Sequence, residues 1–215
     1  DLRNTICFLT TDSNILHCDD LNLAVDIMTF SGIERRGLLV GSNSVINGSG
    51  DEHPFLSVRH KNLLEKVVVL EGNNKIGLGL VEIHPIKVDA VDKSAVGYKL
   101  FFPKFTLSYP GTTAYSEELV EQLKGSDILI LYMPKLERAE DEKVLDVFAV
   151  QELLRLVEPK LCVLTHFGNE VIREDPINVV REIQRSTGVQ CIAAKEGLIL
   201  SPEGLQKRNP VRGYS

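Results

Sequence analysis

The order in which extended and helical patterns follow one another constrains the fold more than any other feature of the sequence. Between residues 66 and 109, apolar runs separated by turn residues indicate an antiparallel meander of strands. From residue 116 onward, helical spacing alternates with short apolar strands. With no Pro-, Gly- or Ser-rich linker after residue 60, this order predicts one αββα domain, in which two sheets pack face to face and helices cover the outer surfaces.

Individual elements follow from the same patterns. In the first part of the chain the patterns predict a strand at residues 5–10, a helix from Asp20 to near Gly32 with Asp20 as its cap, and a strand at 37–40. The Ser-, Asn- and Gly-rich stretch 41–53 is expected to be a mobile loop. In the last part the expected strands are 127–133, 161–165, 189–194 and 198–201, and the expected helices are 116–123, 144–157 and 176–186.

Composition excludes several classes of protein. A chain of 215 residues can bury about 70% of its unfolded surface without a stapling disulfide or metal. The formal net charge is -6, so nucleic acid remains open as a partner but receives no support from bulk electrostatics. No apolar run reaches the roughly 20 residues of a membrane span, and we expect a cytoplasmic protein. The four cysteines form no C-x-x-C pair and are expected to be reduced core residues.

Polar residues that could carry chemistry lie on the loops after predicted strands, where a rigid scaffold positions groups on a free backbone. The loop 11–20 contains His17, and the loop 165–170 begins with Thr165-His166. Taken alone, a histidine at a strand end is more often a hydrogen-bonded structural residue than a ligand. The third loop of interest, 88–95, carries Asp92, which we interpret as part of a solvated turn.

The loop after the first strand resembles one from the metallo-β-lactamase superfamily, in the branch of ribonuclease Z-like and other phosphodiester hydrolases. That family carries a T-H-x-H-x-D-H loop at this point. Here Asp12 and Asn14 occupy the positions of the first two histidines, Leu16 occupies the aspartate's position, and His17 matches. The resemblance extends along the whole chain and implies an αββα sandwich, with a single domain over residues 1–215.

The other ligand positions of the family are similarly altered. The stretch 89–92, where the resemblance expects a histidine, has none, and Ala90 is taken as that position. Thr112 stands in the turn where a carboxylate bridges two metals, His166 is retained, and Glu196 occupies an acidic position near the end. The family binds two zinc ions through imidazoles and carboxylates.

This pattern leaves few donors for a metal. Leu16 and Ala90 offer no lone pair, and the neutral Thr112 cannot bridge two dications. His17 and His166 would then be the residual metal ligands, with Asp12 or Asn14 completing at most a weaker site. We therefore expect either no zinc or weakly bound zinc; the catalytic residues are unknown.

Three functions are compatible with these observations. The first is a metallo-β-lactamase-fold protein with a decayed dinuclear site that acts as a non-catalytic, regulatory or structural member. The second is a metal-dependent hydrolase, phosphodiesterase-like or nuclease-like, that uses His17 and His166 or ligands from a partner chain. The third is a plain α/β binding domain.

The resemblance also bears on the first sheet. In the family, strands precede the T-H-x-H-x-D-H loop, and here only ten residues do. We expect an N-terminally incomplete domain whose first sheet either keeps an open edge or is completed by another chain, in a homo- or hetero-oligomer.

Overall fold

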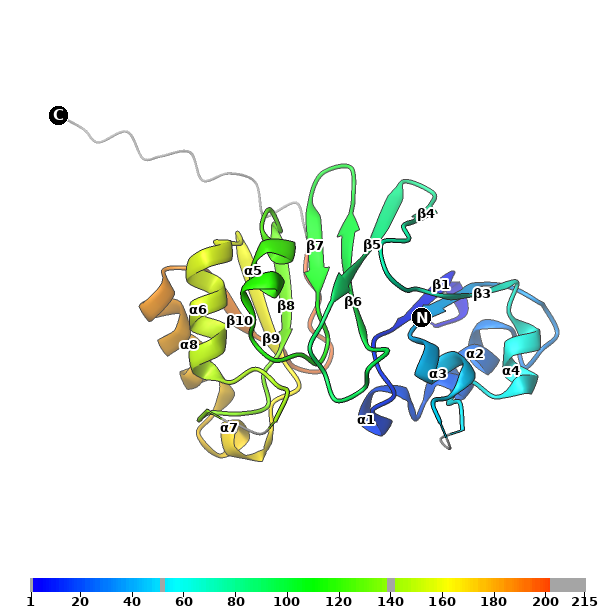
Figure 1. Cartoon of the computed structure of the whole chain (residues 1–215), viewed down its shortest axis with the longest axis horizontal. Helices are drawn as coiled ribbons and strands as arrows, with labels where there is room; N and C mark the ends of the chain where they lie inside the picture. The colour runs from blue at the N-terminus through cyan, green and yellow to red at the C-terminus, as the bar shows by residue number, and fades with distance from the viewer. Residues whose placement is uncertain (1, 51–52, 139–141, 202–215) are drawn as a thin grey trace.

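The computed structural model describes residues 2–50, 53–138 and 142–201. Two sheets face each other, and helices lie on the outer side of each, giving four layers in the order α, β, β, α (Figure 1). The predicted αββα sandwich is confirmed. Within the described part of the chain, no helix has both the length and the apolar character needed to cross a membrane.

The smaller sheet is parallel and has the order β1-β2-β3. One face of this sheet packs on helices in a cluster that includes Val25, Met28 and Leu39, each of which is 0% exposed. A short 3-10 turn, η1 (Leu2–Asn4), precedes β1. The strands are β1 (Cys7–Thr10), β2 (Leu38–Gly41) and β3 (Lys66–Val69); the helices of this half are α1 (Ile15–Cys18), α2 (Leu21–Met28), α3 (Asn43–Asn47) and α4 (Val58–Leu63).

The larger sheet has the order β10-β9-β8-β7-β6-β5-β4. Strands β4 to β7 are antiparallel, as the meander predicts, and β7 to β10 are parallel because helices connect them. The strands are β4 (Ile76–Leu78), β5 (Val81–Lys87), β6 (Val96–Phe101), β7 (Thr106–Tyr109), β8 (Ile128–Tyr132), β9 (Leu161–Thr165) and β10 (Cys191–Ala193). The helices are α5 (Glu117–Leu123), α6 (Val147–Val157), α7 (Asn169–Arg173) and α8 (Pro176–Thr187).

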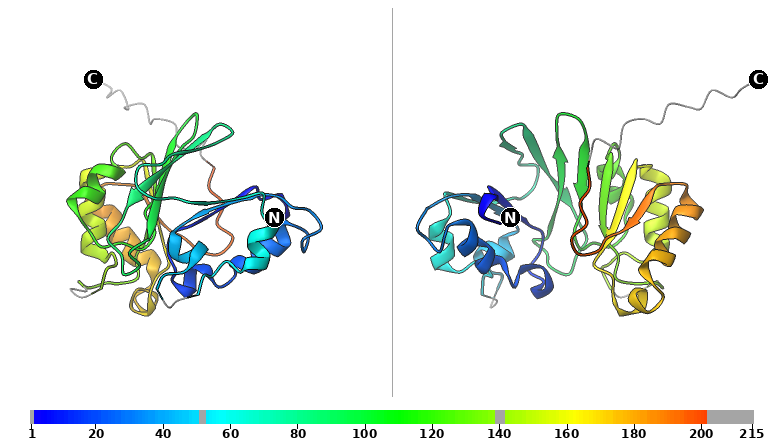
Figure 2. Two further views of the ribbon diagram at one scale, coloured as in Figure 1. Left: turned by 45° about the vertical axis from the view of Figure 1, so that its right-hand side comes forward. Right: turned by 180° about the vertical axis from the view of Figure 1, so that it is seen from behind.

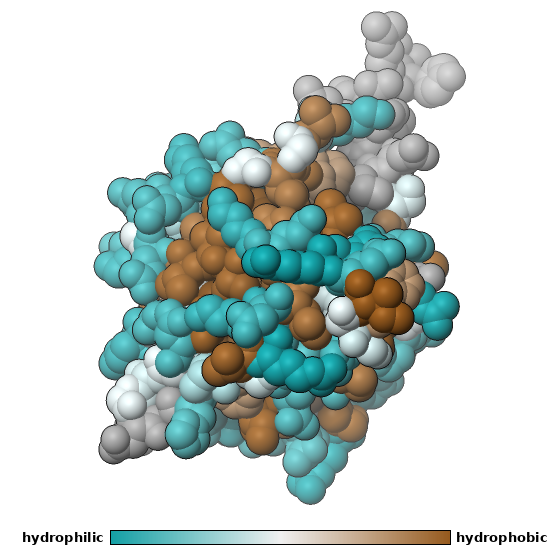
Figure 3. All heavy atoms as spheres, turned by 90° about the vertical axis from the view of Figure 1, so that its right-hand side faces the viewer, coloured by the Kyte–Doolittle hydropathy of each residue, from teal (hydrophilic) through white to brown (hydrophobic). Residues whose placement is uncertain are grey.

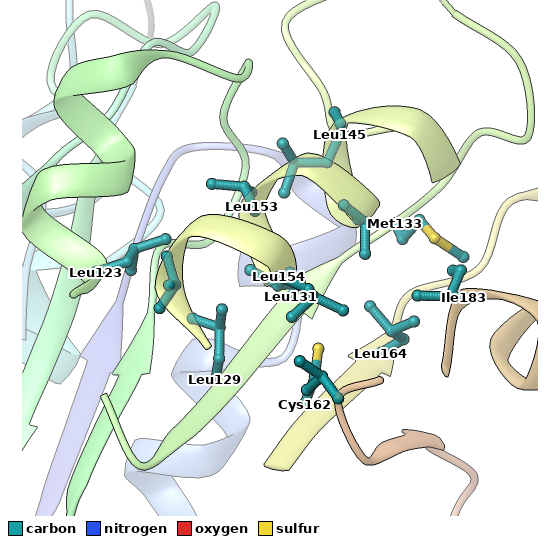
Figure 4. Close-up of a cluster of buried hydrophobic side chains, with 14 of the residues drawn as sticks. Leu123, Leu129, Leu131, Met133, Leu145, Leu153, Leu154, Cys162, Leu164 and Ile183 are labelled. Atoms are coloured by element: carbon teal, nitrogen blue, oxygen red, sulfur yellow. The ribbon is translucent and has the colours of Figure 1, made fainter. Parts of the chain in front are cut away.

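Local sequence sets where these helices begin. The side chains of Ser116, Asp146 and Asp175 each accept a hydrogen bond from a backbone N–H of the first turn of α5, α6 and α8. The apolar faces of α6 and α8 then pack on β8 and β9, where Leu131 and Leu164 are fully buried (Figure 4). This cluster is the main core of the protein.

The two sheets are joined by a polar contact as well as by apolar packing. Tyr98 on β6 is 1% exposed, and its hydroxyl donates to the carbonyl oxygens of Thr10 (2.6 Å) and Val40 (3.2 Å) in the smaller sheet. Figure 2 shows the same layers from two further sides, with helices on the outer side of each sheet. Large apolar side chains such as Ile6, Ile33 and Leu80 are exposed, and Figure 3 shows apolar side chains gathered on the side where β1, β3 and β4 lie.

The structure corrects the prediction for residues 41–53. The described part of this stretch contains helix α3, whose Val45 and Ile46 are buried in the core of the smaller half. The polar composition is explained by the ends of the helix and by Ser44. Its backbone N–H donates to the hydroxyl of Ser94, and its hydroxyl donates to the carboxylate of Asp92. Burial of two apolar side chains outweighs the turn-like composition.

Other elements differ in detail. β3 does not open the meander; it pairs parallel with β2 in the other sheet. The run 76–88 contains two strands because Gly79, at a φ of +59°, turns the chain between β4 and β5. Residues 198–201 form no strand. Asp20 lies at the start of α2, but its side chain makes no capping hydrogen bond.

Candidate functional site

Three aromatic rings from distant parts of the chain meet at the ends of the central strands. The ring centroids of His17 and His166 are 5.1 Å apart, and each lies 5.5 Å from the ring of Tyr132. All three pairs are edge-to-face. Tyr132 ends β8 and His166 follows β9, so the parallel pairing of these strands places the two residues at one edge of the sheet.

His17 lies in a single helical turn of the loop after β1, and this turn places its ring in the cluster. The side chain of Asn14 accepts from the backbone N–H of Leu16 (3.0 Å) and begins α1. Neighbouring residues of a helical turn point in different directions, so His17 faces inward while Leu16 is 78% exposed. Asn14 therefore serves as a helix cap, and Leu16 does not face the site.

His166 reaches the cluster through an unusual backbone conformation. Its φ of +54° lies in the left-handed region, which costs a residue with a Cβ roughly 1 kcal/mol or more. The residue is exposed at the end of β9. Such a conformation persists where the surroundings impose it, and here it turns the imidazole toward His17.

Asp12 holds His17 in place. The Asp12 side chain is 3% exposed, and Nδ1 of His17 donates to its Oδ1 at 2.9 Å. The same carboxylate accepts from the backbone N–H of Asn14 and from the hydroxyl of Thr11, both at 3.0 Å. Burial raises the pKa of Asp12, but the hydrogen bond and charge of His17 and the two other donors outweigh it and lower the pKa.

This hydrogen bond defines the tautomer of His17. In the neutral form of the ring, the proton lies on Nδ1 and the other nitrogen, Nε2, carries a lone pair. Nε2 is buried and has no hydrogen-bond partner among the described residues. Asp12 thus orients the ring and leaves one nitrogen available to a ligand, the arrangement that carboxylates provide behind metal-bound or catalytic histidines.

The neighbouring groups favour neutral forms. Burial, with the nearby His17, lowers the pKa of His166. Burial, followed by the charge of Asp12, raises the pKa of Tyr132 and raises that of Tyr109 to about 12. At neutral pH the cluster therefore presents a neutral imidazole and neutral phenols around one buried carboxylate.

A cavity of about 770 Å³ opens beside the cluster. Its lining includes Asp12, Asn14 and Tyr132, together with Ala90 and Thr112, so four of the residues that the sequence singled out border one space, whereas His17, His166 and Leu16 do not line it. A second cavity of about 400 Å³ lies beside His166 and is walled by residues 165–167 and 194–198. Glu196 belongs to the second cavity.

Asp92 is not part of a solvated turn, as the sequence had suggested. Its carboxylate accepts from the backbone N–H groups of Ser13 (2.9 Å) and Ser94 (2.8 Å) and from the hydroxyls of Ser44 and Ser94. Burial raises the pKa of Asp92, but these four donors lower it overall. Asp92, which lines the larger cavity, therefore joins its own loop to the loop after β1 and to helix α3.

Sequence reasoning missed Tyr132 and the ion pair at the rim between Lys143 and Asp89. Tyr132 could have been found as the last polar group of a predicted strand, next to the strand that ends in His166. The pairing of Lys143 and Asp89, which are 54 positions apart, has no local signal in the sequence.

The donor set does not fit a dinuclear zinc centre. The described residues contain no group of three or more His, Cys, Asp or Glu side chains that could hold a metal ion. Thr112 has a buried hydroxyl oxygen without a described partner, in the position where the family has a carboxylate, and Ala90 is 4% exposed with no donor atom. Asp12 accepts three hydrogen bonds within the protein, which occupy both acceptor sites of Oδ1 and one of Oδ2.

The fold is that of metallo-β-lactamase proteins. The metallo-β-lactamase fold protein YhfI from Bacillus subtilis superposes with a TM-score of 0.71 at 12% identity, over 90% of this chain and 76% of that one. Zn²⁺-bound PqqB from Methylobacterium extorquens gives 0.68 at 15% identity, over 91% and 73%. Unliganded yeast PDE1 gives 0.65 at 14%, over 91% and 68%.

Sequence comparison adds one relative. The chain is 26% identical over 187 residues to the uncharacterised protein MJ1374 of Methanocaldococcus jannaschii, a match that covers 85% of this chain and 68% of the relative. No family model matches the sequence. The expected fold is therefore confirmed, whereas the function must be argued from the site.

Proposed function

We propose that this chain is a metallo-β-lactamase-fold protein whose dinuclear metal centre has decayed and which acts as a non-catalytic, regulatory or structural protein. The observation that carries the proposal is the state of Asp12. Its carboxylate, at a former ligand position, accepts three hydrogen bonds from Thr11, Asn14 and His17. Three of the roughly four acceptor sites of this carboxylate are thus occupied within the protein, so the group stabilises the loop and a metal would have to compete with these hydrogen bonds for it.

The residues at the other expected ligand positions also weaken any metal site. Thr112 is neutral, Ala90 has no donor, and Leu16 faces solvent. Zinc needs about three protein ligands even in an open catalytic site, and the site offers the two imidazoles of His17 and His166. A hydroxide at neutral pH requires a firmly held metal, so hydrolysis at this site is not expected.

The proposal is tested by metal content and activity together. Protein purified without chelator should contain well under one zinc per chain and hydrolyse bis-p-nitrophenyl phosphate no faster than buffer. The matched control is the same preparation incubated with excess zinc and desalted. One or two metals per chain that survive desalting would overturn the proposal.

A second candidate is a metal-dependent hydrolase that uses His17 and His166, with further ligands supplied by a partner chain. It is favoured by the unpartnered Nε2 of His17, which lies in the same ring cluster as His166. Under this alternative, zinc retained by the protein is lost in His166→Ala. Retention of the metal by that variant would place the site elsewhere.

We also propose that the protein forms a homo- or hetero-oligomer. β1 is an edge strand of the smaller sheet, with β2 as its neighbour among the described strands. Edge strands present backbone donors and acceptors to other chains, and apolar side chains such as Ile6 are exposed beside this edge. For the homo-oligomer, light scattering during size-exclusion chromatography should give a mass above 23.9 kDa, and a monomer at micromolar concentration would contradict it and leave the hetero-oligomer.

A further inference from the structure

We propose that Cys162 on β9 and Cys191 on β10 form an oxidisable pair, which hydroperoxides convert into a disulfide across the last two strands of the larger sheet. The two residues are 29 positions apart in the chain and have no local sequence pattern in common. Only the order of strands in the sheet brings them together.

The geometry rests on strand register. Cys191 and Cys162 are Cα partners in the parallel pairing of β10 with β9. Neighbouring strands lie about 4.8 Å apart, within the Cα separation of about 4.4–6.8 Å that disulfides span. Both cysteines are free thiols. Cys162 is 0% exposed in the core beneath α6 and α8 (Figure 4), and Cys191 packs against the same cluster.

β10 is also the strand best placed to adjust. It has three residues and lies at the edge of the sheet, with β9 as its neighbour among the strands that the structure describes. A strand held on one side can shift toward its neighbour by a fraction of an ångström at lower cost than a central strand, because fewer ladder hydrogen bonds must move with it.

The two thiols differ in reactivity. Cys191 is half-buried, and its pKa is lowered by the hydrogen bond with the Cys162 thiol, against the opposing effect of burial. Burial raises the pKa of Cys162 well above its ordinary value. Burial also raises the pKa of Cys7 to about 11 and that of Cys18 to about 12. Cys191 is therefore the thiol that oxidants reach first.

The chemistry proceeds in two balanced steps. The thiolate of Cys191 attacks the outer oxygen of a hydroperoxide, the O–O bond breaks, and an alkoxide or hydroxide leaves while the sulfur becomes a sulfenic acid. The Cys162 thiol then attacks that sulfur and releases water, with its proton going to the departing hydroxyl. Two thiols lose two electrons, and the peroxide gains them.

The bond would have an effect beyond the strand. β10 runs directly into residues 194–198, which wall the cavity of about 400 Å³ beside His166. β9 ends at Thr165, immediately before His166. A covalent link between β9 and β10 therefore fixes the spacing of both walls of that cavity.

The experiment is peptide mapping of the full chain after treatment with hydrogen peroxide and alkylation without reductant. Trypsin should release residues 161–173 and 186–195 as one linked species, two hydrogens lighter than the sum of the two peptides. Cys162→Ser should instead leave a sulfenic acid on Cys191 that dimedone traps. Cys7→Ser is the matched control and should give the same linked species as the unchanged protein.

A second variant keeps the proposal falsifiable if Cys162→Ser does not fold. In Cys191→Ser, a half-buried change, Cys162 should stay reduced after the same treatment because the more accessible of the two thiols is gone. The proposal is overturned if peroxide leaves the 161–173 and 186–195 peptides unlinked, or if Cys162 oxidises equally well in Cys191→Ser. The linked protein should also unfold at a higher urea concentration than the reduced protein.

Discussion

The substitution Asp12→Asn isolates the electrostatic role of the carboxylate behind His17. It keeps the shape of a side chain that is 2% exposed and removes its charge. Hydrogen bonds to charged groups contribute about 1.5–3 kcal/mol and neutral ones about 1 kcal/mol, and three donors converge on Asp12. Because the amide can retain part of this network, we expect a loss of roughly 2 kcal/mol in the free energy of unfolding at pH 7.

The pH dependence gives the decisive test. The pKa of Asp12 in the folded protein lies below its ordinary value of 3.8. Between the two values the unfolded chain binds more protons, so the contribution of the carboxylate is fully present above pH 3.8 and is lost as pH falls through the folded pKa. The stability difference between the native protein and Asp12→Asn should therefore stay constant from pH 7 down to about pH 4 and shrink below pH 3.8.

Urea unfolding followed by circular dichroism at several pH values measures this difference. Asp19→Asn, an exposed change seven residues further along the same segment, is the matched control and should cost less than about 0.5 kcal/mol. The reasoning would be refuted if Asp12→Asn cost no more than this control at pH 7, or if its cost were the same at all pH values.

Two further predictions concern the junctions that hold the site. Tyr98→Phe removes the hydroxyl that donates to the smaller sheet and should lower the free energy of unfolding, measured in urea, by about 1–2 kcal/mol. The exposed Tyr115→Phe is the control and should leave it unchanged. Equal effects of the two changes would argue against a stabilising contact between the sheets at Tyr98. Gly111→Ala places a Cβ 2.8 Å from the Thr11 side chain at a φ of +69°, and should destabilise more than Gly125→Ala, which has a φ of +78° and nothing within 4 Å. If the two alanine variants melt at the same temperature, backbone strain alone explains the cost.

Much of the fold follows from local patterns. The helices α5, α6 and α8 begin at residues whose side chains cap them, and β8 and β9 are short apolar runs between helices. Such signals depend on neighbours a few positions apart, so one sequence is enough to find them. The αββα order follows from the same arrangement.

Prediction failed where burial overrode composition. Residues 43–47 have the Ser and Asn content of a loop, yet they form α3 because Val45 and Ile46 reach the core of the smaller half. Asp92 was predicted to be one charge in a solvated turn. Its carboxylate instead accepts hydrogen bonds from Ser13 and Ser44, which are 79 and 48 positions away, and so links separate segments of the chain. Neither partner set is visible from nearby residues.

The sequence by itself determined the sandwich, the positions of His17 and His166 after their strands, and the residue types Leu16, Ala90 and Thr112 in the loops beside them, because each depends on residue type and local order. The tertiary structure alone decided what the surviving groups do. It placed Tyr132 against both histidines, gave Asp12 three donors, and set Cys162 beside Cys191. These contacts join residues from separate strands and loops, and only the pairing of strands in space brings such residues within reach of one another.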